Sequence, residues 1–95
     1  MHRTSKRRGD DAQLPVIFNA LGDATRLRIF RILLRQPGIC VSEIATELGV
    51  SVPAASYQLK MLETAGFVRR ERQGQKVCYV VRREDPLVKQ ILRLL

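Results

Sequence analysis

Two helical segments follow one another almost without a gap on either side of Gly49, and this spacing constrains the fold more than any other feature of the sequence. Ser42 is suited to cap a helix over residues 43–48, after which Gly49 supplies a turn. Ser51 is a good N-cap for the next helix, which is expected to extend to Ala65. Three apolar residues of that helix have the spacing of a buried stripe: Ala55, Leu59 and Leu62. The sequence thus predicts two helices joined by a tight turn.

Two further helices are predicted on the N-terminal side of this pair. The first covers residues 14–21, with Pro15 in its first turn and Gly22 after its last residue. The second begins after Asp23 or Thr25, either of which can cap it, and ends near residue 35. One face of the second helix is expected to be apolar and another basic, with Leu27, Phe30 and Leu34 on the first and Arg28, Arg31 and Arg35 on the second.

Short β segments are predicted at three places. Residues 39–41 are β-prone and precede the helix pair. Residues 67–72 and 76–81 form a hairpin, joined by three residues in which Gly74 supplies the positive φ angle. An Asp-Pro pair then opens a last helix over residues 87–95.

This order of elements predicts a mainly α-helical domain with a small antiparallel β wing: a winged helix-turn-helix of about five helices and a β-hairpin, over residues 14–95. In such a fold the second helix of the pair enters the major groove of duplex DNA, and the wing reaches the neighbouring backbone. Residues 1–13 are polar and carry Lys6, Arg7 and Arg8, so they are expected to form a flexible basic arm. The arm could follow DNA or only keep the protein in solution.

The net charge favours a polyanionic partner. The chain holds 17 Lys and Arg against 9 Asp and Glu, a formal net charge of +8, whose field attracts nucleic acid or an anionic membrane surface. The basic residues are spread through the predicted fold rather than along one amphipathic face, and no apolar run is long enough to span a bilayer. We therefore expect double-stranded DNA as the partner, no membrane partner and a cytoplasmic location.

The predicted DNA-reading surface is the side of the second helix of the pair that lies opposite the buried stripe. Hydroxyl groups there can bond base edges or phosphates, small apolar groups can touch a thymine methyl, and a lysine suits a phosphate. The candidate residues are Ser51, Val52, Pro53, Ser56, Tyr57 and Lys60. The alternative is that this arc is merely a solvated helix face.

Cationic and polar side chains flank the glycine turn of the predicted hairpin. Flexible cations at this place can follow phosphates or enter a minor groove. The candidate DNA-binding residues are Arg70, Arg72, Gln75 and Lys76, with Arg69 beside them. These charges could instead serve only to prevent edge-to-edge aggregation of the sheet.

Two stretches of the sequence resemble the ArsR/SmtB family of small winged-helix repressors. The first is Leu21-Gly22-Asp23-Ala24-Thr25-Arg26-Leu27-Arg28-Ile29. The second runs from Ser51 through Ser56-Tyr57-Gln58-Leu59-Lys60-Met61-Leu62 to Ala65-Gly66-Phe67-Val68. The resemblance covers about residues 14–95, and it implies a homodimeric repressor that binds an inverted-repeat operator and is released by metal ions or by thiol oxidation.

The resemblance also implies that the first and last helices join the two subunits. Both helices are rich in apolar residues, which independently favours dimerisation because a single small domain cannot cover them. The candidate interface residues are Val16, Ile17, Leu87, Ile91, Leu92 and Leu95.

The sequence departs from the family at its metal-sensing positions. Members that bind thiophilic metals carry Cys-x-Cys at the start of the third helix, whereas Cys40-Val41-Ser42 keeps only the first cysteine. Members that bind zinc at the dimer interface place Asp and His pairs on the last helix, and this chain's only histidine is His2. Such ions need about three or four ligands in fixed geometry. We therefore expect no metal site and no cofactor, and leave open a site shared between subunits with Cys78 or His2.

Cys40 and Cys78 allow a redox interpretation. In a winged helix the strand before the third helix pairs with the returning strand of the wing, so the two cysteines can lie on neighbouring strands. Strand alternation places both on the same side, at a Cβ separation of about 4.5 to 5.5 Å, which is near but above that of a disulfide. A disulfide between them could control DNA binding. Alternatively, both are small hydrophobic residues without such a role.

An enzyme is not expected, because the sequence contains no Gly-rich phosphate loop, no histidine in the folded part and no acid pair in an evident pocket. The competing interpretation is a winged helix that serves as a protein-interaction module. The charge of +8 and the basic hairpin favour DNA instead. The sequence thus predicts a dimeric, sequence-specific DNA-binding transcriptional regulator, and it favours no particular inducer.

Overall fold

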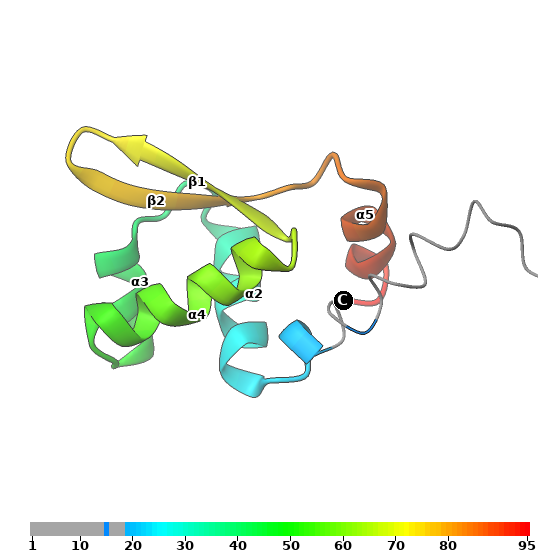
Figure 1. Ribbon diagram of the computed structural model, residues 1–95, viewed down its shortest axis with the longest axis horizontal. Coiled ribbons are helices and arrows are strands. Elements are labelled where there is room, and N and C mark those ends of the chain that lie inside the picture. The colour runs from blue at the N-terminus through cyan, green and yellow to red at the C-terminus, as the bar shows by residue number, and fades with distance from the viewer. Residues whose placement is uncertain (1–14, 16–18) are drawn as a thin grey trace, which may run out of the picture.

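The computed structural model describes residue 15 and residues 19–95. Within these residues the elements follow in the order α2 (Ala24–Arg35), α3 (Val41–Leu48), α4 (Val52–Thr64), β1 (Val68–Gln73), β2 (Lys76–Val81) and α5 (Pro86–Leu92) (Figure 1). Pro15 and residues 19–21 are also helical. The predicted fold class, a mainly α-helical domain with a two-stranded wing, is confirmed. The predicted arm over residues 1–13 and the predicted interface residues Val16 and Ile17 lie outside the described residues.

Polar side chains start three of the helices where the sequence predicts them. The Asp23 carboxylate accepts from two amides in the first turn of α2, at 2.8 and 3.1 Å. The Ser51 hydroxyl accepts from the amide of Ala54 in α4 at 3.2 Å, and the Asp85 carboxylate accepts from two amides of α5 at 3.0 and 3.2 Å. Each side chain bonds amides that lack a partner within their own helix.

Helix α3 begins earlier than predicted. The Glu43 carboxylate accepts a 3.0 Å hydrogen bond from the amide of Cys40, so Cys40 is the residue before the helix and Val41 is its first residue. The predicted cap at Ser42 is therefore wrong, because Ser42 already lies in the first turn. The predicted strand over residues 39–41 is reduced to a single antiparallel bridge between Cys40 and Cys78. The last helix also differs, because α5 ends at Leu92 rather than at residue 95.

The core lies between α2, α4 and the wing. The predicted stripe on α4 is confirmed, since Ala55, Leu59 and Leu62 are fully buried. On α2 the buried residues are Ile29, Phe30, Ile32 and Leu33. Two of the three residues predicted for that face, Leu27 and Leu34, are only partly buried. The reason is that α2 contacts both α4 and β2, so its buried arc is wider and turned from the predicted one.

One aromatic contact joins α2 to the start of the wing. The rings of Phe30 and Phe67 lie 5.2 Å apart in an edge-to-face arrangement, and both side chains are almost completely buried. This contact ties the helical core to the segment from which β1 extends.

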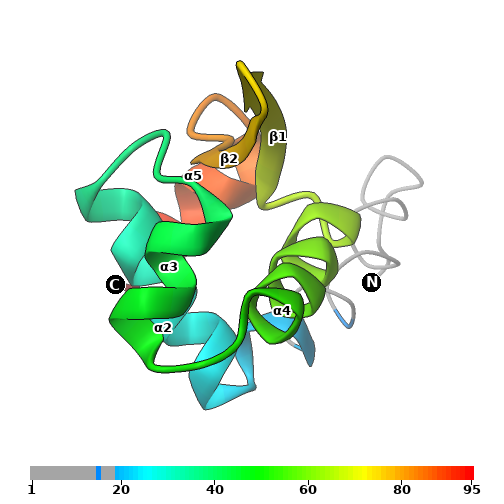
Figure 2. The ribbon, with the colours of Figure 1, turned by 90° about the vertical axis from the view of Figure 1, so that its left-hand side faces the viewer.

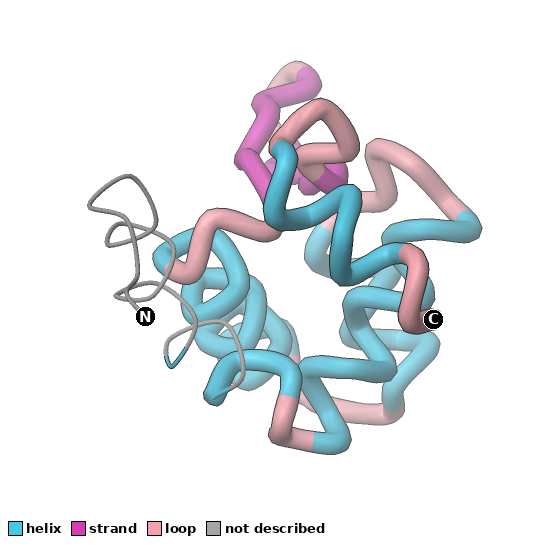
Figure 3. The backbone as a smooth tube through the Cα atoms, turned by 90° about the vertical axis from the view of Figure 1, so that its right-hand side faces the viewer, coloured by secondary structure: helices cyan, strands magenta, loops and turns pink. Residues whose placement is uncertain are grey.

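The wing is an antiparallel hairpin whose register runs from Val68 opposite Val81 to Gln73 opposite Lys76. The connection therefore has two residues rather than the predicted three, because Gln73 is itself paired. Gly74, with φ of +66°, supplies the left-handed conformation of the turn. The tip of the hairpin lies at the end of the molecule that holds α3 and the start of α4, and α5 lies at the opposite end (Figures 1 and 3).

Candidate nucleic-acid interface

Helices α3 and α4 form a helix-turn-helix with a connection of three residues. Gly49 ends α3 in the left-handed conformation, with φ of +73°, which a residue with a Cβ adopts only with strain. The amide of Val50 then donates to the carbonyl of Ala45 at 3.0 Å, which closes the turn before Ser51 caps α4. Figure 2 views this end of the molecule, with α3 and α4 side by side beneath the hairpin.

The predicted reading residues lie on the outer side of α4. Ser51, Val52, Pro53, Tyr57 and Lys60 are exposed, and Ser56 is partly exposed. Tyr57 is 62% exposed and Val52 48%, large values for such side chains in a small domain. An aromatic and an apolar side chain held away from the core can contact bases and thymine methyl groups.

The predicted cationic residues of the wing are likewise exposed. Strand alternation places Arg70 and Arg72 on one face of β1, and both border a surface hollow with Val77. Arg69 faces the other way, where it pairs with Glu71 at 3.4 Å and with Glu84 at 3.6 Å. Among the described residues, Arg70 and Arg72 have no such ion pair with an acid. Their charges are therefore available to an anionic partner.

A cavity of about 360 Å³ connects α4 to the wing. Its lining includes six of the ten predicted DNA-binding residues, three from α4 and three from the wing: Val52, Ser56, Lys60, Arg70, Gln75 and Lys76. The cavity opens between the outer face of α4 and the face of the hairpin that carries Arg70. The helix and the wing thus present their polar side chains to one common space.

Two further lining residues, Ser42 and Tyr79, were not predicted as site residues. Ser42 reaches the cavity from the first turn of α3, and Tyr79 pairs with Arg70 across the hairpin. Burial raises the pKa of the Tyr79 hydroxyl above its ordinary value, Glu63 raises it further and Arg70 lowers it. Tyr79 therefore stays neutral near pH 7 and can donate a hydrogen bond. The alternation of the strand was a signal for Tyr79, because it shares a face with Val77.

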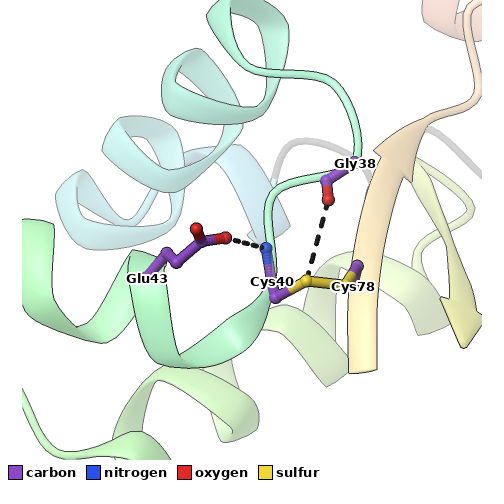
Figure 4. The surroundings of a disulfide bond; sticks show 4 residues. All are labelled: Gly38, Cys40, Glu43 and Cys78. Carbon is purple, nitrogen blue, oxygen red and sulfur yellow. Dashed lines mark hydrogen bonds between the residues drawn. A yellow bond between two sulfur atoms is a disulfide. The ribbon is translucent and has the colours of Figure 1, made fainter. Parts of the chain in front are cut away.

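The two cysteines are joined by a disulfide (Figure 4). Cys40 precedes α3 and Cys78 lies in β2, so the bond connects the start of the helix-turn-helix to the wing. The same bridge is held by main-chain hydrogen bonds between Tyr79 and Ile39 at 3.0 Å and between Gly38 and Tyr79 at 3.2 Å. The prediction that the two cysteines lie on the same side of neighbouring segments is confirmed, although Cys40 belongs to a single bridge and not to a strand.

The predicted interface residues of the last helix differ in exposure. Leu95 is 48% exposed, and Leu87 and Leu92 are partly buried against the core. Ile91 is only 8% exposed within a single subunit. It therefore belongs mainly to this subunit's own core, although the sequence placed it at the interface. Leu94, which the sequence analysis did not name, is 75% exposed.

The described part of the chain contains no group of three or more His, Cys, Asp or Glu side chains that could hold a metal ion. In the same residues, no helix has the length and apolar character needed to cross a membrane.

A helix-turn-helix whose second helix and basic wing share one polar surface defines a winged helix-turn-helix DNA-binding protein. The profile of the family described as "Bacterial regulatory protein, arsR family" matches residues 23–70. This chain belongs to that family, and it is a DNA-binding transcriptional regulator. The family's description is that of regulatory proteins.

Several proteins of the family are similar over most of this chain. An HTH-type transcriptional regulator of Methanocaldococcus jannaschii is 37% identical over 82% of this chain and 85% of its own length. The SmtB homologue of Synechocystis, a transcriptional repressor, is 39% identical over 70% of this chain. This match covers 50% of the Synechocystis protein, so the chain spans about half of that relative.

Solved structures share the fold along almost the whole chain. The homodimeric winged helix-turn-helix DNA-binding domain of Mycobacterium bovis has a TM-score of 0.79 at 26% identity, covering 99% of this chain and 84% of that domain. Reduced HlyU from Vibrio cholerae has a TM-score of 0.78 at 27% identity, covering 97% of this chain and 94% of HlyU.

Proposed function

We propose that this protein is a homodimeric repressor that binds an inverted-repeat operator in the cytoplasm, with α4 in the major groove and the wing on the adjacent backbone. The observation that carries the proposal is the cavity shared by α4 and the wing. Lys60 lines it from the helix, and Arg70 and Lys76 line it from the hairpin. DNA that enters the groove with α4 would meet these cations at the phosphates beside it.

Dimerisation is supported by the apolar C-terminal end and by a structural relative. Leu94 and Leu95 are 75% and 48% exposed, which leaves apolar surface at the end of the chain for a second copy. The similar domain of Mycobacterium bovis is homodimeric. A dimer with twofold symmetry reads two half-sites about 10 base pairs apart, so its operator is an inverted repeat.

The proposal is tested by selecting bound duplexes from a random library. We expect the selected DNA to contain an inverted repeat, and its affinity to exceed that of random duplex by about 10³-fold or more. A transcription assay on the selected promoter should then show repression. Selection of no common sequence would favour the protein-interaction module, and a direct repeat would contradict the symmetric dimer.

We further propose that the Cys40–Cys78 disulfide controls DNA binding. It joins the residue before α3 to the second strand of the wing, and both elements border the cavity. The disulfide fixes the wing against the start of α3 and so restricts the spacing that the wing can adopt relative to α4 when DNA binds. Because several charge contacts depend on that spacing, oxidation is expected to lower DNA affinity.

The test compares operator binding with the thiol state of the protein. Mass spectrometry without reductant should show a loss of two hydrogens on mild oxidation, in parallel with loss of affinity, and both should reverse on reduction. The Cys40→Ser, Cys78→Ser double variant should bind the operator equally with and without oxidant. A disulfide that forms without any change in affinity would eliminate redox control and leave the repressor proposal intact.

A further inference from the structure

Side chains of α4 approach the cavity between α4 and the wing along a single line. Val52, Ser56 and Lys60 all line the cavity, and they follow one another at intervals of four residues, so they lie one above the other on the same side of the helix. The line begins with an apolar side chain at the start of α4, continues with a hydroxyl and ends with a cation. The helix therefore gives the cavity an apolar end and a cationic end.

The hairpin repeats this arrangement on the other side of the cavity. Arg70 and Tyr79 are directly paired across the strands, and Val77 lies on the same face, two residues nearer the turn. All three line the cavity. The tip of the hairpin and the start of α4 lie at the same end of the molecule (Figure 1), so Val77 belongs to the same end of the cavity as Val52. Arg70 belongs to the end that holds Lys60.

The lining carries positive charge without a compensating acid. Its charged residues are Lys60, Arg70 and Lys76, and the described lining contains no aspartate or glutamate. Within the described residues, none of these three cations forms an ion pair. Helix α3 adds to the positive potential, because its first two residues, Val41 and Ser42, line the cavity and a helix N-terminus favours anions. A hollow lined by one sign of charge concentrates ions of the opposite sign.

Tyr79 adds a neutral donor beside Arg70. Its side chain is almost completely buried, and its hydroxyl forms no hydrogen bond within the described residues. The same residues contain no fully enclosed side-chain nitrogen or oxygen without a partner, so this hydroxyl is open to the cavity that Tyr79 lines. Burial, and to a smaller extent Glu63, raise the pKa of the hydroxyl, which keeps it protonated. It can therefore donate to an anion that Arg70 binds.

We propose that the cavity binds a small carboxylate with an apolar body, and that this ligand and DNA exclude one another. Lys60 and Arg70 bind the carboxylate, to which the Tyr79 hydroxyl also donates. The apolar body contacts Val52 and Val77. The volume of about 360 Å³ lies near the lower end of the range for ligand pockets, about 300 to 1,000 Å³. This inference rests on the proposed function, and it names the chemical class of the inducer.

The exclusion follows from the cations that the two partners share. The proposed DNA complex directs Lys60 and Arg70 at phosphates, and a carboxylate bound between them neutralises the charges on which those contacts depend. By linkage, the ligand lowers the affinity for DNA by the same factor by which DNA lowers the affinity for the ligand. The ligand is therefore expected to release the repressor from its operator.

The test titrates the full chain, without DNA, with four probes and follows its amide resonances by NMR. The probes are 3-phenylpropanoate, its neutral amide, propanoate and inorganic phosphate. We expect 3-phenylpropanoate to bind at least about tenfold more tightly than each of the others at low salt. Equal binding of the amide would overturn the cationic end of the site. Equal binding of propanoate or phosphate would overturn the apolar end and leave only a general anion site.

A matched pair of double variants assigns the preference to the cavity. Lys60→Gln with Arg70→Gln should abolish the preference for 3-phenylpropanoate over its amide. Lys89→Gln with Arg93→Gln, at the C-terminal end of the chain, removes the same charge and should preserve the preference. The same preference in both double variants would overturn the proposal.

Single variants test the two ends of the site separately. Tyr79→Phe is expected to weaken 3-phenylpropanoate about fivefold, because the carboxylate loses one donor, and to leave the affinity for random duplex almost unchanged, because Tyr79 is almost completely buried. Val52→Ser should weaken 3-phenylpropanoate and leave propanoate unchanged. Tyr57→Phe, at an exposed position outside the described lining, is the control and should bind 3-phenylpropanoate like the parent. Unchanged binding of 3-phenylpropanoate in Tyr79→Phe or Val52→Ser would contradict the position of the ligand.

Competition with random duplex distinguishes failure of the ligand site from failure of the proposed function. 3-Phenylpropanoate should displace the parent protein from the duplex, and its amide should not. No binding of 3-phenylpropanoate by a protein that selects an inverted repeat would refute the ligand and leave the repressor proposal intact. Binding in the cavity by a protein that binds no duplex would refute the proposed function alone. Binding that leaves the duplex affinity unchanged would overturn the exclusion, and with it the inducer.

Discussion

Arg26 and Gln58 are joined by a hydrogen bond across 32 residues of sequence, with Nη1 of Arg26 donating to Oε1 of Gln58 at 2.9 Å. The same guanidinium donates from Nε to the carbonyl of Ala20 at 2.8 Å and from Nη2 to that of Asn19 at 3.3 Å. One side chain thus connects α2, the recognition helix α4 and the helical residues 19–21. Because the guanidinium is planar and its donors are fixed relative to one another, this contact sets the orientation of α4.

Replacing this guanidinium should loosen the attachment of α4. Arg26→Met is expected to lower the free energy of unfolding by about 1 to 2 kcal/mol, because the main-chain carbonyls of Ala20 and Asn19 and the side-chain oxygen of Gln58 lose their donor. Arg26→Lys should rescue little, since one ammonium group does not reproduce the planar fork. Urea unfolding measures both, with Arg31→Met, at an exposed position of the same helix, as the control. Full stability of Arg26→Lys would show that only the charge matters.

The outer face of α4 and the wing should contribute differently to DNA binding. Ser56→Ala and Tyr57→Ala are expected to lower affinity for the selected operator by about 1 to 3 kcal/mol and to leave random duplex almost unchanged. Arg72→Gln should instead weaken both DNAs and reduce the slope of affinity against salt by about one unit. Titrations at several salt concentrations separate the two behaviours. Equal losses on both DNAs for Ser56→Ala and Tyr57→Ala would mean that this face does not read bases.

The fold could be predicted from the sequence where one local signal decides each feature. The caps at Asp23, Ser51 and Asp85 and the buried stripe of α4 depend on spacing within a single turn or face, and they are confirmed. The start of α3 depends on which of two nearby side chains caps the helix. The Glu43 carboxylate accepts from the amide of Cys40, so the helix begins at Val41 and the Ser42 hydroxyl is not the cap. The buried face of α2 differs from the predicted one because both α4 and β2 pack against this helix.

Part of the candidate DNA-binding site could also be predicted, because local sequence patterns mark some of its residues. Periodicity identifies the exposed residues of α4, and the basic hairpin is visible in the composition of residues 69–76. The sequence does not place α4 against the wing, and only that packing brings Lys60 and Arg70 to one cavity with Tyr79. Arg69 and Arg70 are adjacent in sequence, yet alternation sends the first to Glu71 and Glu84 and the second to the cavity.

Dimerisation should depend on the exposed C-terminal leucines rather than on Ile91. Leu94→Glu with Leu95→Glu is expected to give folded monomers with weakened operator binding, because the charges would be buried against a second copy. Ile91→Glu should unfold the subunit instead, since Ile91 is only 8% exposed. Light scattering and circular dichroism distinguish the two results, with Lys89→Gln on the same helix as the control. A parent protein that is monomeric at micromolar concentration would eliminate this interface.

Tyr79 should make the folded state sensitive to alkaline pH. Burial raises the pKa of its hydroxyl above the ordinary value of about 10, Glu63 adds to the rise and Arg70 opposes it. Between the ordinary and the raised pKa the folded state binds more protons than the unfolded state, so the free energy of unfolding falls as pH rises through this range.

Tyr79→Phe removes the titrating group and should lose less stability than the parent between about pH 8 and pH 11. The two proteins differ only at this hydroxyl, so the difference between their urea midpoints isolates Tyr79. The control is Tyr57→Phe, at a position that is 62% exposed, and its stability should follow that of the parent. Identical pH profiles for Tyr79→Phe and the parent would show that the Tyr79 hydroxyl ionises as readily in the folded chain as in the unfolded one.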